Sequence, residues 1–204
     1  MATLSSPRDI ILLLLSFFLF PFIIHGAKEN HKHYTLIQKT CKIINTELNY
    51  LDYDFCISAL QARPAKECAT LRDIGMTCIN LVMNNVTDTR RHIRGVMNSG
   101  KVQHWVRRCV DECYDLYDLA VDRMGDALKA FKHKEYMEAE DEFSMVDNSM
   151  QLVEELFKVG SRDSPAGGCG GGVSPFSARN NDTTQLCGMG MLVMNCLRKG
   201  NCID

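Results

Sequence analysis

Residues 136–157 read YMEAEDEFSMVDNSMQLVEELF, and apolar residues recur in this stretch at every third or fourth position. The recurring set is Tyr136, Ala139, Phe143, Val146, Met150, Val153 and Phe157. The positions between them are mostly polar or acidic, so a helix here would have one apolar face and one polar face. The stretch therefore predicts a long amphipathic helix packed inside a larger core.

The same periodicity continues on both sides of this segment. Apolar residues at helical spacing run from Val102 to Phe131 and from Cys68 to Val96, and a shorter set runs from Leu186 to Cys196. No segment shows sustained alternation of apolar and polar residues. The connection at Lys132–Lys134 is short, which favours antiparallel packing of the helices it joins. The sequence predicts an all-α protein in which residues 64–204 form an up-and-down four-helix bundle.

Two further segments complete the expected organisation. Shorter helices over 34–48 and 54–61 precede the bundle, end before Pro64, and form an N-terminal helical hairpin within residues 27–63. The glycine-rich segment 160–175 predicts a loop before the last helix, which we expect from Ser177 to Arg198 with Gly200 as its stop.

Composition and the N-terminus indicate export. The chain has 204 residues, 10 cysteines and a net charge of −2, which argues against a nucleic-acid partner and for an oxidising compartment. An apolar run over 10–24 follows Arg8 and is short for a membrane span. We predict a signal peptide over 1–26, with a signal anchor as the alternative. After cleavage, we expect no association with a membrane.

Three blocks of residues carry a family resemblance. They are Thr40-Cys41-Lys42 followed by Tyr53-Asp54-Phe55-Cys56, then Arg108-Cys109-Val110-Asp111-Glu112, and finally Leu186-Cys187-Gly188 with Met191–Asn195. In this order they resemble the opening, the second bundle helix and the last helix of plant invertase and pectin methylesterase inhibitors. The opening block is most similar to the pollen invertase-inhibitor-like branch of that family.

The resemblance implies a secreted protein that is not an enzyme, uses no cofactor and blocks the active cleft of a plant cell-wall enzyme. The turn over 99–105 lacks the Pro-Lys-Phe element that the resemblance leads us to expect in invertase inhibitors. Pectin methylesterase is therefore the nominal target. A cell-wall or vacuolar invertase is the alternative target, and a non-inhibitory, cysteine-rich extracellular protein is the alternative function. The expected location is the apoplast, with the vacuole as the alternative.

The resemblance also implies disulfides. It pairs Cys41 with Cys56 inside the hairpin, and it assigns Cys109 a partner in the following helix. No cysteine occurs between Tyr114 and Gly168, so that second bond is either lost or rerouted to Cys169 in the loop.

Candidate partner-binding residues fall into two groups. Trp105, Arg107 and Arg108 lie near the turn between the first two bundle helices, with Arg90, Arg91, Arg94 and Lys101 close to them. Asp111, Asp115, Asp118, Asp122 and Asp126 fall within about 80° of one helix face. Either group could bind a partner protein, the aspartates through salt-dependent contacts with basic residues, or be an ordinary solvated surface.

Other chemistry finds little support in the sequence. Neither the G-x-S-x-G nor the H-E-x-x-H motif occurs, and the spaced pair Cys109 and Cys113 has no histidine at ligand spacing, so we predict neither catalysis nor a metal site. Asn85-Val86-Thr87 and Asn181-Asp182-Thr183 are candidate glycosylation acceptors.

Overall fold

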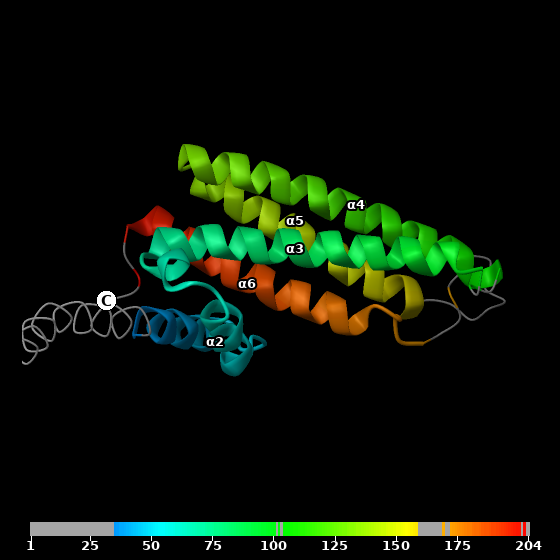
Figure 1. The fold of residues 1–204 in the computed structure, drawn as a ribbon, viewed down its shortest axis with the longest axis horizontal. Coiled ribbons are helices and arrows are strands. Elements are labelled where there is room, and N and C mark those ends of the chain that lie inside the picture. The colour runs from blue at the N-terminus through cyan, green and yellow to red at the C-terminus, as the bar shows by residue number, and fades with distance from the viewer. Residues whose placement is uncertain are drawn as a thin grey trace, which may run out of the picture.

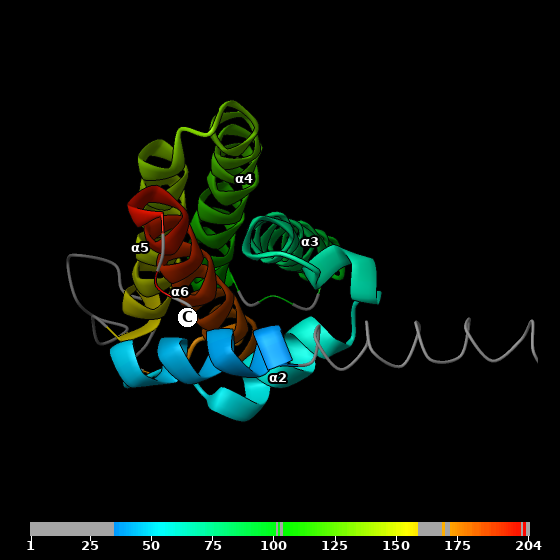
Figure 2. The ribbon, with the colours of Figure 1, turned by 90° about the vertical axis from the view of Figure 1, so that its left-hand side faces the viewer.

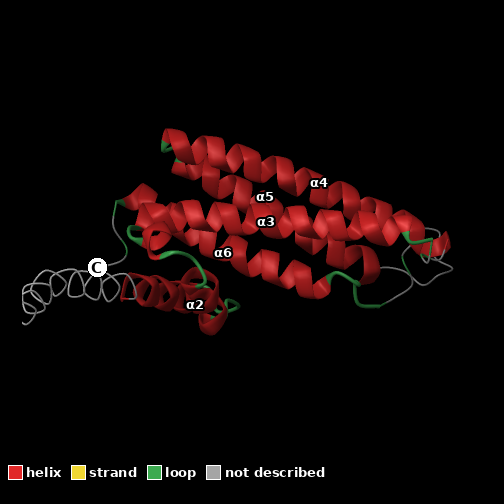
Figure 3. Cartoon of the chain, viewed as in Figure 1, coloured by secondary structure: helices red, strands yellow, loops and turns green. Residues whose placement is uncertain are grey.

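The computed structural model describes residues 35–100, 102, 104–158, 169, 172–200 and 202, and all regular structure within them is helical. The elements are a helix over 35–47, α2 (Tyr53–Gln61), a short 3-10 helix η1 (Ala65–Cys68), α3 (Leu71–Asn98), α4 (His104–His133), α5 (Tyr136–Lys158) and α6 (Ser177–Lys199). The prediction of an all-α fold is confirmed (Figure 3). The expected signal peptide over 1–26 lies outside the described residues.

Helices α3 to α6 run side by side along the long axis and alternate in direction (Figure 1). Each packs against two neighbours, because contacts join α3 to α4, α4 to α5, α5 to α6 and α6 back to α3. This closed arrangement is the predicted up-and-down bundle. The helix over 35–47 and α2 form the hairpin, which lies beside α6 and on the opposite side of the bundle from α4 (Figure 2).

The start of α3 differs from the expectation that Cys68 belongs to the first long helix. Cys68 ends the separate 3-10 helix, and α3 begins at Leu71. The cause is the capping box at Thr70, whose hydroxyl oxygen accepts from the Asp73 N–H at 3.1 Å. In return, the Asp73 carboxylate accepts from the Thr70 N–H at 3.0 Å. These bonds satisfy donors that a helix start leaves unpaired, so the chain enters α3 from an extended conformation.

The expected stop of the last helix at Gly200 is confirmed. Helix α3 ends at Asn98, and α6 ends at Lys199 with Gly200 in the left-handed region at φ 83°. Gly200 adopts this conformation without the steric penalty that a Cβ atom brings. Lys134 also has a positive φ, of 64°, in the tight connection between α4 and α5.

A buried polar cluster ties three helices together. The Tyr117 hydroxyl on α4 donates to Asn180 Oδ1 on α6 at 2.6 Å. The Asn180 amide donates to Glu154 on α5, whose other carboxylate oxygen accepts from the Ser177 hydroxyl at 2.7 Å. Because Tyr117 is fully buried, its partner on α6 fixes how the last helix sits against α4.

The hairpin is held to α6 by a close approach at Gly188. A Cβ atom there would lie 3.0 to 3.3 Å from the side chains of Tyr50, Leu51 and Leu48, so the absence of a side chain lets the hairpin reach the helix. The Asp52 N–H also donates to Gln185 Oε1 at 3.0 Å. Within the hairpin, Cys41 and Cys56 form a disulfide with their Cα atoms 5.7 Å apart.

Two more disulfides occur among the described residues. Cys109 on α4 is bonded to Cys169, with a Cα separation of 6.2 Å. Cys196 is bonded to Cys202 just beyond the end of α6. The remaining cysteines, Cys68, Cys78, Cys113 and Cys187, are buried as free thiols. The Cys109–Cys169 bond therefore links the start of α4 to the segment before α6.

Candidate protein-binding surface

The structure describes only part of the group expected around the turn before α4. Trp105 lies in the first turn of α4, but its side chain, like all of Lys101, lies outside the described residues. Arg107 and Arg108 are exposed on the same helix. Whether this group binds a partner stays a prediction.

The arginines of this group pair with neighbours on the protein's own surface. Arg90 of α3 forms an ion pair with Asp118 of α4 at 2.5 Å, and Arg91 pairs with Asp88 at 2.6 Å. The Arg94 guanidinium donates to the Tyr114 hydroxyl and lies 5.1 Å from the centre of that ring.

The two members of this group on α4, Arg107 and Arg108, pair along their own helix. Arg107 lies 3.8 Å from Asp111, and Arg108 lies 3.2 Å from Glu112. Exposed pairs of this kind add little stability, but each offsets the positive charge of its arginine. The area around the turn is therefore a mixed-charge surface rather than a free basic patch.

The aspartates expected on one face of α4 are distributed unevenly. Asp118 lies at the edge facing α3, where it pairs with Arg90, while Asp115 and Asp122 are exposed. Asp126 accepts a hydrogen bond from Lys129 at 2.8 Å, and this contact lowers the pKa of the Asp126 carboxyl. The structure brings the five aspartates to one side of α4, with the most accessible ones toward the middle and end of the helix.

An exposed apolar side chain lies beside these aspartates. Leu119 is 42% exposed and lies about 20° beyond the arc of the aspartates, on the side toward α5. At the edge of α4 that faces α5, Arg123 forms an ion pair with Glu142 of α5 at 3.4 Å. The solvent face of α4 between these two ion-paired edges is thus acidic, with one exposed leucine on its α5 side.

Sequence reasoning missed the exposed apolar residues of α5. Met137, Met145 and Leu152 are 43% to 53% exposed and fall within about 80° of one another around the helix. All three lie outside the apolar set that the helical spacing assigns to the core. That mismatch is the signal that could have identified them, because large apolar residues on the polar face of an amphipathic helix are candidates for a partner contact.

We define the α4–α5 face as Asp115, Leu119, Asp122 and Asp126 of α4 with Met137, Asp141, Met145 and Leu152 of α5. All eight residues are exposed, and α4 and α5 are packed neighbours. The face combines accessible apolar side chains with carboxylates, which is a composition suited to a protein partner bearing apolar and basic residues. It lies away from the hairpin, which covers the α6 side of the bundle (Figure 2).

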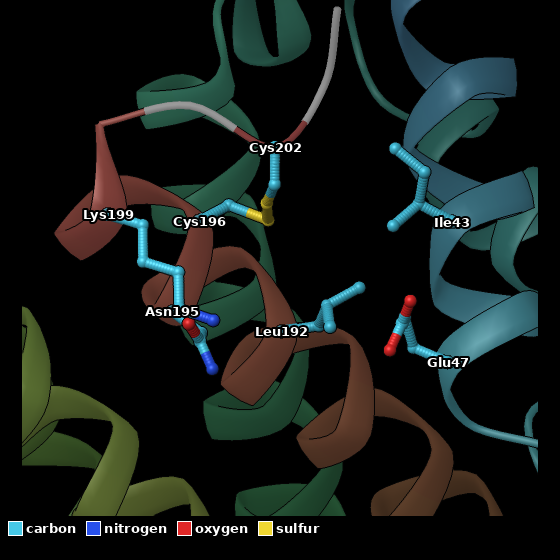
Figure 4. Close-up of a pocket in the computed structure, with 7 residues that line it drawn as sticks. All are labelled: Ile43, Glu47, Leu192, Asn195, Cys196, Lys199 and Cys202. Carbon is cyan, nitrogen blue, oxygen red and sulfur yellow. A yellow bond between two sulfur atoms is a disulfide. The ribbon is translucent and has the colours of Figure 1, made fainter.

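A groove of about 330 Å³ lies elsewhere, between the helix over 35–47 and the end of α6 (Figure 4). Its lining is Ile43, Glu47, Leu192, Asn195, Cys196, Lys199 and Cys202, with the Cys196–Cys202 disulfide at one side. One carboxylate, one ammonium group and one amide are its main polar groups. This lining includes no histidine or free thiol, so it does not supply a nucleophile and base of the kind that enzymes use.

Metal binding at the α4 cysteines also lacks support. Cys109 is engaged in the disulfide with Cys169, and burial raises the pKa of the Cys113 thiol to about 12. A metal needs the deprotonated thiolate, which this environment disfavours. Within the described part of the chain, no group of three histidine, cysteine or acidic residues could hold a metal ion.

Comparison with known proteins decides the family. The family model described as plant invertase/pectin methylesterase inhibitor matches residues 35–191. The chain belongs to this family. Its members are inhibitors of enzymes, and the match spans the hairpin and all but the last turns of α6. The resemblance seen in the sequence is confirmed.

Relatives and solved structures agree with that assignment. A protein from Platanus acerifolia, named as a candidate invertase inhibitor, is 26% identical over 162 residues, which are 79% of this chain and 85% of that protein. An Arabidopsis thaliana protein named cell wall / vacuolar inhibitor of fructosidase 2 is 28% identical over 48% of this chain and 51% of its own length. A crystal structure of a mutant form of a pectin methylesterase inhibitor from Arabidopsis shares the fold, with a TM-score of 0.58 at 16% identity over 74% of this chain and 95% of that one.

Among the described residues, no helix is both long and apolar enough to cross a bilayer.

Proposed function

We propose that this family member is a secreted inhibitor of an acid invertase, a β-fructosidase of the cell wall or vacuole, and that it covers the active cleft of that enzyme. The names of its relatives are the observation that supports invertase as the target. The Platanus protein that matches 79% of this chain and the Arabidopsis relative are both named as inhibitors of this class of enzyme. The signal peptide expected over 1–26 and the disulfides support export to the apoplast or the vacuole.

The α4–α5 face is the surface we assign to this contact. Its apolar side chains stand on two packed helices, so they are held in place before binding and little entropy is lost when a partner orders them. Its carboxylates would attract a basic rim around the enzyme's cleft and orient the approaching partner. A rigid bundle laid across a cleft excludes substrate without entering the catalytic chemistry.

Pectin methylesterase is the second candidate target. The specific observation in its favour is the turn over 99–105, which lacks the Pro-Lys-Phe element expected of invertase inhibitors. The similarity to a solved pectin methylesterase inhibitor concerns the fold alone, because the identity is 16%. The turn is thus the reason to assay both enzymes.

The test is an inhibition titration of purified acid invertase and, in parallel, of pectin methylesterase by the oxidised protein at mildly acidic to neutral pH. The proposal predicts saturable inhibition of invertase near one inhibitor per enzyme. Inhibition of the methylesterase alone would transfer the function to the second candidate. A protein that is folded and helical by circular dichroism yet inhibits neither enzyme would contradict the proposal and favour the non-inhibitory alternative.

A further inference from the structure

The two candidate glycosylation triplets contact each other across the interface between α3 and α6. Asn85 lies on α3 and is the acceptor residue of one triplet, while Thr183 on α6 is the hydroxyl residue of the other. The Thr183 hydroxyl lies 2.9 Å from both Asn85 Oδ1 and the Arg179 carbonyl oxygen, and it shares its single proton between them. Thr183 is fully buried. The acceptor of the first triplet is therefore part of the packing of the bundle.

A glycan on Asn85 would conflict with this packing. Asn85 is half-buried at the edge of this interface. Its side-chain oxygen is directed to α6, and Val82 and Thr89, its neighbours toward α6 on the same helix, are fully buried. N-linked sugar attaches to the side-chain amide nitrogen, next to the oxygen that Thr183 contacts. A sugar ring at that position would press against the contact between α3 and α6, where overpacking is destabilising.

Asn181 has the opposite environment. It is exposed in the first turns of α6, and it lies about 200° around the helix from Thr183, away from the α3 interface. One turn later, the hairpin covers this side of α6, because Gln185 accepts from the Asp52 N–H and Gly188 contacts the Tyr50 region. Asn181 comes just before that covered part, so a glycan there can extend into solvent.

We propose that the folded, exported protein carries one N-linked glycan, on Asn181, and none on Asn85. In the modification, the Asn181 amide nitrogen bonds to the anomeric carbon of a lipid-linked oligosaccharide. The bond from that carbon to the carrier pyrophosphate breaks, and the amide proton is lost as the pyrophosphate leaves. Chains modified at Asn85 cannot close the α3–α6 interface and are retained. The glycan lies on the α6 side of the bundle, so it leaves the α4–α5 face free for the enzyme (Figure 2).

This inference rests on the secretory route of the proposed function, and the test separates the two. The full chain is expressed in plant cells, and the exported protein is digested and analysed by mass spectrometry after enzymatic release of N-glycans. Two variants are compared with it. Asn181→Gln removes the exposed acceptor, and Thr87→Ala removes the other triplet while leaving Asn85 and its contact with Thr183 in place.

We expect one glycan on the exported protein, mapped to Asn181, with its mobility shift lost in Asn181→Gln and kept in Thr87→Ala. A glycan on Asn85 in the exported, folded protein would overturn the inference, as would an exported protein with Asn181 unmodified. Retention of the chain in the cytosol with both sites unmodified would contradict the secretory route itself, and the inference with it.

Discussion

Gly190 lies where α6 passes directly against the ring of Phe143 on α5. A Cβ atom at this glycine would overlap the ring, and Phe143 is fully buried, so the ring has no free space into which it can move. We expect Gly190→Ala to lower the free energy of unfolding by about 1–3 kcal/mol, the usual cost of overpacking a core. Urea denaturation followed by circular dichroism measures this change.

Gly125→Ala is the matched control, since it is also a glycine inside a bundle helix. A Cβ atom at Gly125 would meet nothing within 4 Å. The substitution should therefore stabilise α4 by about 0.5–1 kcal/mol through helix propensity alone. Equal effects of the two substitutions would show that the contact between α5 and α6 is wrongly placed.

The buried free thiols make stability depend on alkaline pH. Burial raises the pKa of Cys78 and of Cys113 from the usual 9.0 to about 12. Above about pH 9 the unfolded chain loses these protons while the folded protein keeps them, so the stability that is present below pH 9 is lost as the pH rises toward 12. Burial shifts the pKa of the Cys187 thiol in the same direction.

Thermal unfolding measured from neutral pH to about pH 10 tests this expectation. The melting temperature should be level near neutrality and fall once the pH passes about 9. In Cys78→Ala, the starting value is lower because a buried side chain is truncated, but the fall should be shallower. A melting temperature that does not change over this range would be inconsistent with buried, protonated thiols.

At the scale of elements, the disulfide between Cys109 and Cys169 connects the start of α4 to the segment before α6. The bond closes a sequence separation of 60 residues, so it restricts the unfolded chain strongly. We expect Cys169→Ser to lower the free energy of unfolding by about 2–4 kcal/mol while the helices remain. Denaturant titration of the oxidised variant measures this loss.

Cys202→Ser is the control for that prediction, because Cys196–Cys202 spans a separation of only 6 residues. The short loop restricts the unfolded chain less, so its removal should cost less. If the two variants lost the same stability, or if Cys169→Ser lost none, the assigned role of the Cys109–Cys169 bond would be wrong.

The long helices are predictable from the sequence because in each one apolar residues recur at every third or fourth position. The apolar spacing in 136–157 predicts α5, and Gly200 predicts the end of α6, and both are confirmed. Apolar spacing alone predicts too early a start for α3, because a helix cap leaves no mark in that spacing. The capping box at Thr70 separates Cys68 from the helix.

Contacts between elements were harder to predict. Tyr117 and Asn180 are 63 residues apart in the chain, and Asn180 and Glu154 are 26 apart, so no local pattern announces that they meet. The ion pair between Arg90 and Asp118 could not be predicted from the sequence for the same reason. The sequence therefore does not show the partners of the candidate binding residues, and its apolar spacing does not identify the exposed residues of α5.

At the scale of the whole molecule, we propose that binding takes place on one side of the bundle, the α4–α5 face. Among the described residues, Leu119, Met137, Met145 and Leu152 are the large exposed apolar side chains of the four long helices. The double variant Met145→Asp with Leu152→Asp puts charge where apolar contact is expected. A residue at the centre of an interface contributes at least about 1 kcal/mol to the binding free energy. Because two such residues are changed, inhibition should weaken by roughly tenfold or more.

The control adds the same charge to another surface. Asn80 and Asn84 are exposed on the outer side of α3, so Asn80→Asp with Asn84→Asp changes the net charge equally without touching the α4–α5 face. This variant should inhibit like the original protein. Equal weakening by both double variants would point to a general charge effect instead of a defined contact.

The most direct test of the central claim is a titration of acid invertase activity with the folded, oxidised protein, carried out beside the Met145→Asp, Leu152→Asp variant. We expect the unaltered protein to abolish activity at close to one inhibitor per enzyme and the variant to require a much higher concentration. Full invertase activity in excess of the folded protein would contradict the proposed target. Equal inhibition by the two proteins would contradict the assignment of the α4–α5 face.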